Sequence, residues 1–248
     1  MTSRIDSYED LAEQIVNWIK DYYWDNDLGG LVVGVSGGID SAVVSTLCAE
    51  TGFPTYVLTM PLHSKKGNTE LSDVHAKALS KKYSNVRVVN IDLSNTYESL
   101  LFDIDQDFVN NKLANANTKS RLRMVTLYQV AGSVGGIVVG TGNKVEDYGV
   151  GFYTKYGDGG VDIAPIADLY KSEVWELGEF LGVDERICDA PPTDGLWDDG
   201  RNDEDQIGAT YVELEEAMEN KTGVAVNILE EYNKKNRHKM EPIPTFKL

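Results

Sequence analysis

The sequence predicts an α/β fold, a Rossmann-like, doubly wound parallel sheet with helices on both faces. Two observations support this fold. Apolar runs that suit strands alternate with stretches of helical spacing, which is the pattern of βαβ units. These runs are apolar at consecutive positions, as in GIVVG at 136–140, and such strands are typical of parallel sheets that helices cover on both sides. The predicted strands are 31–35, 54–60, 86–91 and 137–141, with helical stretches near 40–51, 68–83 and 94–132.

A helix is expected before the first strand, over residues 7–24. Ser7 and Asp10 have the spacing of a weak capping box. Apolar side chains then recur at the intervals of one helical face, at Leu11, Ile15, Trp18, Ile19 and Tyr22. Because such a helix must bury its apolar face, we expect it to pack as a lid on the sheet.

The segment LVVGVSGGIDS at 31–41 predicts a phosphate-binding turn between a strand and a helix. Adjacent glycines let the backbone approach a ligand, and a helix N-terminus supplies unpaired N–H groups and partial positive charge. The lysine of a Walker P-loop and the third glycine of a dinucleotide fingerprint are both missing from this segment. In open parallel sheets, ligands bind beyond the carboxyl ends of the strands, where this turn lies.

Beyond residue 141 the sequence becomes rich in glycine and tyrosine, and the segment 141–162 is too long for a simple connection. Helical patterns follow at 171–181, 208–219 and 224–236, with an acidic stretch at 189–205. We expect one domain over 1–248. Its parts are the N-terminal helix 7–24, an α/β core over about 30–190 and a C-terminal helical tail over about 203–248.

Composition narrows the classes of partner. The 23 Lys and Arg residues against 40 Asp and Glu give a formal charge of −17, which repels nucleic acid at long range. The two cysteines, Cys48 and Cys188, form no metal-binding or disulfide pattern, which favours a reducing compartment. No leader-like start and no apolar run long enough to span a membrane is present, so a cytoplasmic protein that binds neither nucleic acid nor membrane is expected.

Five ordered blocks carry a resemblance to a known family. The SGGxDS turn resembles the pyrophosphate loop of N-type ATP pyrophosphatases, which split ATP between its α and β phosphates. With four further blocks, the chain resembles the ammonia-dependent NAD synthetases over nearly its whole length. The further blocks are NTKSRLRMVTLY at 117–128, GTGNKVE at 140–146, FYTKYGDGGVDIAPIADLYK at 152–171 and RHK at 237–239.

The resemblance implies the adenine nucleotide alpha hydrolase-like version of the fold and an ATP- and Mg²⁺-dependent ligase. In this reaction the carboxylate of deamido-NAD attacks the α-phosphate of ATP and releases pyrophosphate. Ammonia then displaces AMP from the adenylated intermediate to give NAD. The carboxylate needs this activation because ammonia would otherwise have to displace an oxide ion, which is a very poor leaving group. The family also implies a homodimer.

The resemblance assigns the Mg²⁺ site to two carboxylates, Asp40 and Glu146. Asp40 also suits the first turn of a helix, where an acid interacts favourably with the macrodipole. The family pattern places the second acid four residues before a glycine, whereas Glu146 precedes Gly151 by five. An extra residue after Glu146 explains this spacing, and Asp147 stays open as the alternative.

Further residues are assigned by resemblance to the two substrates. The residues expected at ATP are Gly34, Val35, Ser36, Gly37, Gly38, Ile39, Asp40, Ser41, Thr141, Lys171 and Thr193. Those expected at deamido-NAD are Arg121, Lys155, Asp162, His238 and Lys239. The adenine contacts stay unassigned, because the segment 60–68 matches the family poorly.

Three residues are the catalytic candidates. Lys171 is expected to neutralise phosphate charge, and Lys155 to offset the charge of the nicotinate carboxylate. Asp158, held between glycines, is our candidate for taking a proton from ammonium before attack. The alternative for Asp158 is a turn-forming aspartate that bonds to its own backbone.

The nitrogen donor and the function both have alternatives. Only about 30 residues precede the first strand, so we expect no fused amidohydrolase domain. Free ammonia is therefore the expected nitrogen donor. A separate glutaminase partner is the alternative source of nitrogen. Another ATP pyrophosphatase, GMP-synthetase-like or tRNA-modifying, is the alternative within the superfamily. A non-catalytic module that only binds ATP is the alternative outside it.

Overall fold

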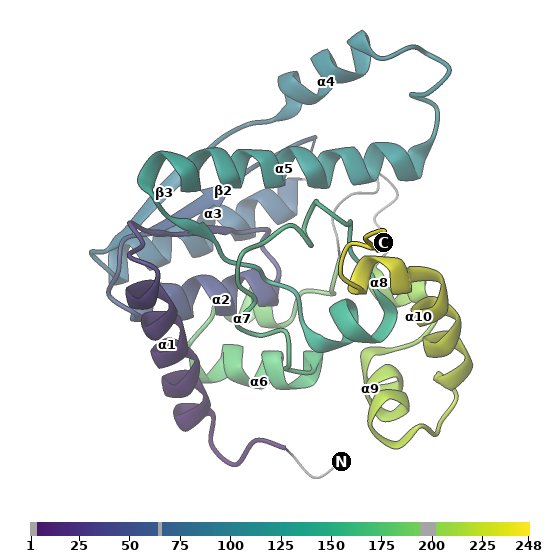
Figure 1. Ribbon diagram of the computed structural model, residues 1–248. Helices are drawn as coiled ribbons and strands as arrows, with labels where there is room; N and C mark the ends of the chain where they lie inside the picture. Colours follow the sequence, from purple (N-terminus) through teal and green to yellow (C-terminus); the bar gives the residue numbers. More distant parts are fainter. Residues whose placement is uncertain (1–3, 64–65, 194–201) are drawn as a thin grey trace.

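A four-stranded parallel sheet lies at the centre of the computed structural model, which describes residues 4–63, 66–193 and 202–248 (Figure 1). The strand order is β3-β2-β1-β4, and every neighbouring pair is parallel. The strands are β1 (Leu31–Gly34), β2 (Thr55–Thr59), β3 (Val86–Asn90) and β4 (Ile137–Val138). The prediction of a parallel α/β sheet is therefore confirmed.

Helices cover both faces of the sheet, as the apolar strands predict. Leu31 and Val33 of β1 belong to a core shared with α1, α2, α3 and α6, whereas Val32 between them belongs to a core shared with α5. This alternation follows from the period of two along a strand. The helices are α1 (Tyr8–Asp25), α2 (Ile39–Glu50), α3 (Lys66–Lys82), α5 (Lys112–Val134) and α6 (Lys171–Phe180).

The N-terminal helix α1 forms where the sequence predicts it. Ser7 caps the helix by accepting a hydrogen bond from the N–H of Asp10, at 3.1 Å. Its main contacts are with α2 and α6, so it covers the sheet indirectly, as an outer layer on the helices (Figure 1).

The stretch 94–132 forms two helices, α4 (Ser94–Asp103) and α5, with a non-helical connection between them. Side chains in the connection bond to nearby backbone: Asp105 accepts from the N–H of Asp107, and Asn111 caps α5 by accepting from Ala114. Such local bonds compete with helix formation, which explains the break. The fourth strand is also shorter than predicted and continues only as a bridge between Val139 and Ile163.

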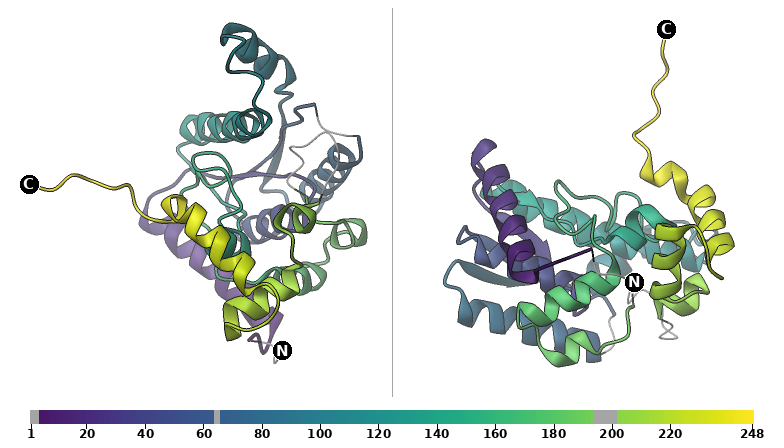
Figure 2. Two further views of the ribbon diagram at one scale, coloured as in Figure 1. Left: turned by 90° about the vertical axis from the view of Figure 1, so that its right-hand side faces the viewer. Right: turned by 90° about the horizontal axis from the view of Figure 1, so that it is seen from below.

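The C-terminal helices pack around a second core beside the carboxyl ends of the strands. This core joins the π-helix η1 to the last helices, with Tyr211 and Leu214 fully buried at its centre. Figure 2 shows the residues after α10 leaving the body as an extended segment. The elements are η1 (Val145–Val150), α7 (Glu185–Cys188), α8 (Asp203–Ile207), α9 (Tyr211–Asn220) and α10 (Val226–Met240).

The helices predicted at 208–219 and 224–236 correspond to α9 and α10, whereas the short α7 and α8 have no counterpart in the prediction. In the part of the chain that the structure describes, no helix combines the length and apolar character needed to cross a membrane. Both cysteines, Cys48 and Cys188, are free thiols.

Candidate functional site

The turn between β1 and α2 has the predicted strand-to-helix geometry. Gly37 adopts φ 94°, a backbone conformation that favours glycine. The N–H of Ser36 and the N–H of Gly38 donate to the hydroxyls of Ser41 and Ser36, at 3.1 and 3.2 Å. Gly38 is the N-cap of α2 and offers no side chain to cap it. The N-terminus of α2 is therefore available to an anion at the carboxyl end of β1.

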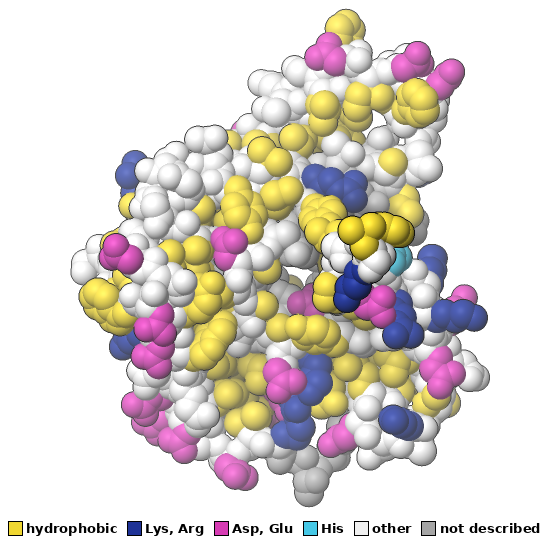
Figure 3. Space-filling model, viewed as in Figure 1, with side chains coloured by type: hydrophobic (Ala, Val, Ile, Leu, Met, Phe, Trp, Pro, Cys, Tyr) yellow, Lys and Arg dark blue, Asp and Glu magenta, His cyan; other side chains and the backbone are white. Residues whose placement is uncertain are grey.

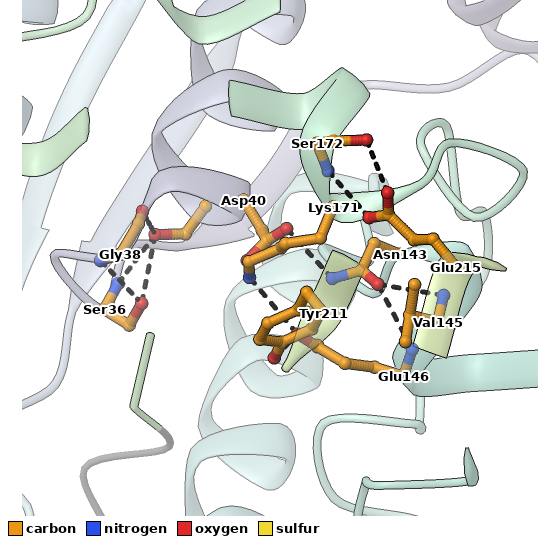
Figure 4. Close-up of polar contacts among 11 residues, drawn as sticks. Ser36, Gly38, Asp40, Asn143, Val145, Glu146, Lys171, Ser172, Tyr211 and Glu215 are labelled. Carbon is orange, nitrogen blue, oxygen red and sulfur yellow. Dashed lines mark hydrogen bonds and ion pairs between the residues drawn. The ribbon is translucent and has the colours of Figure 1, made fainter. Parts of the chain in front are cut away.

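Two carboxylates and one ammonium meet beside this turn, and we call them the acid–lysine cluster: Asp40, Glu146 and Lys171 (Figure 4). Asp40 lies in the first turn of α2, Glu146 in η1, and Lys171 at the start of α6. Lys171 Nζ contacts Asp40 Oδ2 and lies 3.2 Å from Glu146 Oε1. Asn143 Nδ2 donates to Asp40 Oδ1 at 3.2 Å. The side chain of Lys171 is only 3% exposed, whereas those of Asp40 and Glu146 are 16% and 18% exposed, so the lysine is buried and the carboxylates are partly buried.

The cluster holds Lys171 charged although it is buried. Burial acts to lower the pKa of Lys171, but the carboxylates of Asp40 and Glu146 outweigh it and raise that pKa above its ordinary value. Burial likewise acts to raise the pKa of Glu146, yet Lys171 and the hydroxyl of Tyr211 together lower it. An ammonium is therefore fixed beside the first turn of α2, where Asp40 lies.

The π-helix η1 explains the unusual spacing between Glu146 and Gly151. A π-helical turn accommodates one residue more than an α-helical turn, and such turns are frequent at functional sites. Asn143 Oδ1 fixes its start by accepting from the N–H groups of Val145 and Glu146, both at 3.1 Å. Glu146 contacts the same ammonium as Asp40, that of Lys171, whereas the carboxylate of Asp147 lies against Gly142, where a Cβ would overlap it. The geometry therefore favours Glu146 over Asp147 as the partner of Asp40.

The buried carboxyl group of Asp147 makes the folding stability depend on pH. Burial, with the nearby charges of Glu146, Asp158 and Asp40, raises the pKa of Asp147 to about 7 from an ordinary 3.8. The folded state thus retains a proton that the unfolded chain has lost, and stability falls as the pH rises through this window. We expect Asp147→Asn to stabilise the unliganded protein by about 1–3 kcal/mol near pH 8 and to have little effect near pH 4.

Thermal melting of the wild type and Asp147→Asn across this pH range measures the effect. The exposed Asp21 provides the matched control, since Asp21→Asn should leave the melting temperature nearly unchanged at every pH. An Asp147→Asn shift of the same size at both pH values would contradict the prediction.

The donor set of the cluster suits a hard divalent cation. Asp40 and Glu146 direct carboxylate oxygens toward one cation, Lys171, and Mg²⁺ is normally held by one or two carboxylates together with phosphates and water. No group of three or more His, Cys, Asp or Glu residues suited to a metal ion is found over 4–63, 66–193 and 202–248. A metal ion at this position would accordingly need phosphate oxygens to complete its coordination.

Asp158 lies in a tight turn packed on α5. Its Oδ1 accepts from the hydroxyl of Ser120 at 2.6 Å and from the N–H of Thr154 at 3.0 Å, and its own N–H donates to Ser120 at 2.8 Å. A Cβ on Gly157 would overlap Ser120, so glycine is required there. Burial raises the pKa of Asp158 despite these bonds. The contacts fit the turn-forming alternative, and the proton-accepting role stays a prediction.

Four of the residues expected at the dinucleotide come together around the segment 151–156. Arg121 donates to the carbonyl of Lys155 at 3.3 Å, and Lys155 Nζ donates to the carbonyl of His238 at 2.7 Å. Lys239 Nζ donates to the carbonyls of Gly151 and Tyr153. We call Arg121, Lys155 and Lys239 the basic group. Within the described part of the chain, none of the three forms an ion pair with a carboxylate, so their charges remain available to an anion.

Figure 3 shows a hollow in the middle of one face, edged mainly by hydrophobic side chains, with both basic and acidic side chains beside it. The remaining candidates lie apart from the basic group. Asp162 accepts from the N–H of Val138 at 2.8 Å and from Tyr128 at 2.9 Å, so both its oxygens join β4 to α5. Thr141 is half-buried just beyond β4. Thr193 is exposed and adjoins residues 194–201, which lie outside the described residues, as do 64–65 of the unassigned segment 60–68.

Sequence reasoning missed several side chains that hold the candidates in place. Ser120 holds Asp158, and Tyr211 donates to Glu146 Oε1 at 2.7 Å. Asn143 stands inside the GTGNKVE block, so its place in the block was the available signal. Tyr211 gave no signal, because an aromatic residue at the start of an amphipathic helix is typical of core packing.

The chain is similar to known proteins over nearly its whole length. The family model for NAD synthase matches residues 11–243. An NH₃-dependent NAD⁺ synthetase from Carboxydothermus hydrogenoformans is 39% identical over 239 residues, covering 94% of this chain and 95% of the relative.

Two solved structures have the same fold. The structure of NMN synthetase from Francisella tularensis superposes with a TM-score of 0.91 at 33% identity, covering 98% of this chain and 100% of that chain. The NH₃-dependent NAD synthetase from Campylobacter jejuni superposes with a TM-score of 0.78 at 24% identity, covering 97% of this chain and 100% of that chain.

Proposed function

Because the chain belongs to the NAD synthase family, we propose that it converts deamido-NAD to NAD with ammonia as nitrogen donor and ATP as activator. The observation that carries this proposal is the acid–lysine cluster beside the Ser36–Ser41 turn. It offers a fixed ammonium and two hard carboxylates where a triphosphate would lie. The basic group on the segment 151–156 and α10 offers charge for a second anionic substrate.

Each part of the site has a task in such a reaction. The N-terminus of α2 and the turn would hold the departing pyrophosphate. Lys171 would stabilise the charge that develops on the phosphate under attack, since it is already oriented by Asp40 and Glu146. Mg²⁺, held by Asp40 and Glu146, would withdraw further charge from the phosphates. Arg121, Lys155 and Lys239 would hold deamido-NAD with its carboxylate toward ATP.

The test is a set of parallel reactions with ATP, Mg²⁺ and deamido-NAD, supplied with ammonium, glutamine or neither, in which both pyrophosphate and NAD are measured. NAD formed with ammonium alone supports the proposal. Pyrophosphate without NAD would point to another ATP pyrophosphatase with a different acceptor. Tight ATP binding without any pyrophosphate would favour the non-catalytic binding module.

A second acceptor is favoured by one observation, the TM-score of 0.91 and 33% identity with the structure of an NMN synthetase. The corresponding candidate function is amidation of the deamidated mononucleotide. The values of kcat/KM for deamido-NAD and for nicotinic acid mononucleotide, measured side by side, decide between the two acceptors. We expect the dinucleotide to be preferred, because the 39% identical relative is an NAD⁺ synthetase.

We also propose that the protein is a homodimer. Large apolar side chains are exposed in the extended segment after α10, at Ile243 and Phe246, and on α5, at Leu113 and Val125. Where exposed apolar side chains form one continuous patch, they are typical of contact with a partner. Light scattering at micromolar concentration should give twice the mass of one chain, and a monomer would count against the dimer. The cytoplasmic location stays a prediction.

A further inference from the structure

Helix α9 reaches the acid–lysine cluster through two side chains that lie one turn apart. Tyr211 and Glu215 are four residues apart and therefore share one face of the helix. Both are buried, at 1% and 2% exposure. Their shared face contacts η1 and α6, the elements that carry Glu146 and Lys171 (Figure 4).

Tyr211 holds the carboxylate side of the cluster. Its hydroxyl donates to Glu146 Oε1 at 2.7 Å, the same oxygen that lies 3.2 Å from Lys171 Nζ. The ring of Tyr211 also lies 5.1 Å from Lys171 Nζ and packs edge-on against Trp175. A hydrogen bond to one oxygen fixes the rotation of the carboxylate about its last bond. Such outer contacts orient the groups that bind a metal ion.

Glu215 holds the lysine side of the cluster. Its Oε1 accepts from the N–H of Ser172 at 2.9 Å, and its Oε2 accepts from the hydroxyl of Ser172 at 2.6 Å. Ser172 directly follows Lys171 in the first turn of α6, where N–H groups have no partner inside the helix. Glu215 therefore fixes the backbone from which the side chain of Lys171 begins.

We propose that Tyr211 and Glu215 are positioning residues, through which α9 holds Glu146 and Lys171 at the separation that the nucleotide and its metal ion require. The inference rests on the proposed function. The competing explanation is that Tyr211 only fills the second core. In that case its hydroxyl would be dispensable for ligand binding, and phenylalanine would replace it without effect there.

Tyr211→Phe tests the proposal because it removes one oxygen and keeps the ring. We expect the Mg²⁺ concentration for half-maximal rate to rise by about 10–100-fold, the range known for outer contacts of metal ligands. Mn²⁺ binding in the presence of a non-hydrolysable ATP analogue should weaken by the same factor. The KM for deamido-NAD should change little, since the basic group is untouched.

Tyr232→Phe is the matched control. Tyr232 packs on the same core, and its hydroxyl donates to the carbonyl of Gln206 at 2.9 Å, away from the cluster. It should leave Mn²⁺ binding unchanged. If Tyr211→Phe also binds Mn²⁺ and the ATP analogue as the wild type does, the proposal is overturned.

Glu215 is tested by a pair of variants. Glutamine keeps an acceptor for the N–H of Ser172 and a donor for its hydroxyl, whereas alanine keeps neither. We expect Glu215→Ala to raise the KM for ATP by about tenfold and Glu215→Gln to restore it to nearly the wild-type value. Equal KM values for the two variants and the wild type would overturn the role of Glu215.

Failure of the proposed function can be told apart from failure of this inference. If the wild type forms no NAD from ammonium, the proposed function fails. Binding of Mn²⁺ and of the ATP analogue still tests the role of Tyr211 in that case.

Discussion

Replacing Lys171 with methionine will lower kcat/KM for NAD formation by about 10²–10³-fold or more. Losing one preorganised group that stabilises developing charge typically costs this much, and Lys171 is the cation that Asp40 and Glu146 hold beside the turn proposed to bind pyrophosphate. Methionine is of similar length and carries no charge, so the change removes the ammonium while largely filling its space. Pyrophosphate release in the presence of deamido-NAD and NAD formation in the presence of ammonium should fall together.

The same substitution will destabilise the unliganded protein. Asp40 and Glu146 share Lys171 as a buried cation, and breaking such a pair typically costs about 3–5 kcal/mol because a buried charge is left uncompensated. Lys171 lowers the pKa of Glu146, so its loss should raise that pKa. A carboxyl whose folded pKa is raised favours folding at low pH, and Lys171→Met should therefore regain stability as the pH falls.

Lys144→Met is the matched control. Lys144 is paired at 2.8 Å with Asp168, whose side chain is 87% exposed, so this pair contributes little to stability. Its loss should leave both the melting temperature and the rate close to those of the wild type. A Lys171→Met enzyme that kept the wild-type rate would show that the acid–lysine cluster has no part in catalysis.

The sequence predicts the sheet well because its two central strands, β1 and β2, are largely buried on both faces, so their apolar runs can be recognised without knowledge of their partners. Residues 94–132 show where this approach fails. Residues 103–111, DIDQDFVNN, are rich in Asp and Asn, whose side chains favour turns and helix caps over helix interiors. Bonds such as those of Asp105 and Asn111 separate α4 from α5 there. Local competition of this kind depends on geometry that a hydrophobic pattern does not contain.

In the candidate site, too, the sequence identifies residues but not the contacts between them. Asp40 and Lys171 follow from motifs read one at a time, but they lie 131 positions apart, and their direct pairing depends on how α2 and α6 pack. The sequence assigned Lys171 to phosphate alone, and the structure adds that two carboxylates hold it in place. Likewise, the spacing after Glu146 suggested an extra residue, and the π-helix η1 shows how the backbone accommodates it.

Asp158→Asn will lower the rate of the ammonia-dependent step by about 10²–10⁴-fold, the usual contribution of a general base, if Asp158 takes the proton from ammonium. Asparagine keeps the oxygen that accepts from Ser120 and Thr154, so the turn should persist. Because burial raises the pKa of Asp158, a neutral replacement should not destabilise the fold near pH 8. The adenylation step, followed by ATP–pyrophosphate exchange without ammonium, should stay near its wild-type rate.

The pH dependence separates the two roles open to Asp158. Free ammonia becomes more abundant as the pH rises, so a variant without its proton acceptor should recover part of its rate at alkaline pH. Ser120→Ala is the complementary variant, because it removes the hydroxyl that holds Asp158 while keeping the carboxylate. It should lower stability by about 1–3 kcal/mol with a smaller loss of rate. If Asp158→Asn matched the wild-type rate at every pH, the carboxylate would serve the turn alone, and the proton of ammonium would need another acceptor.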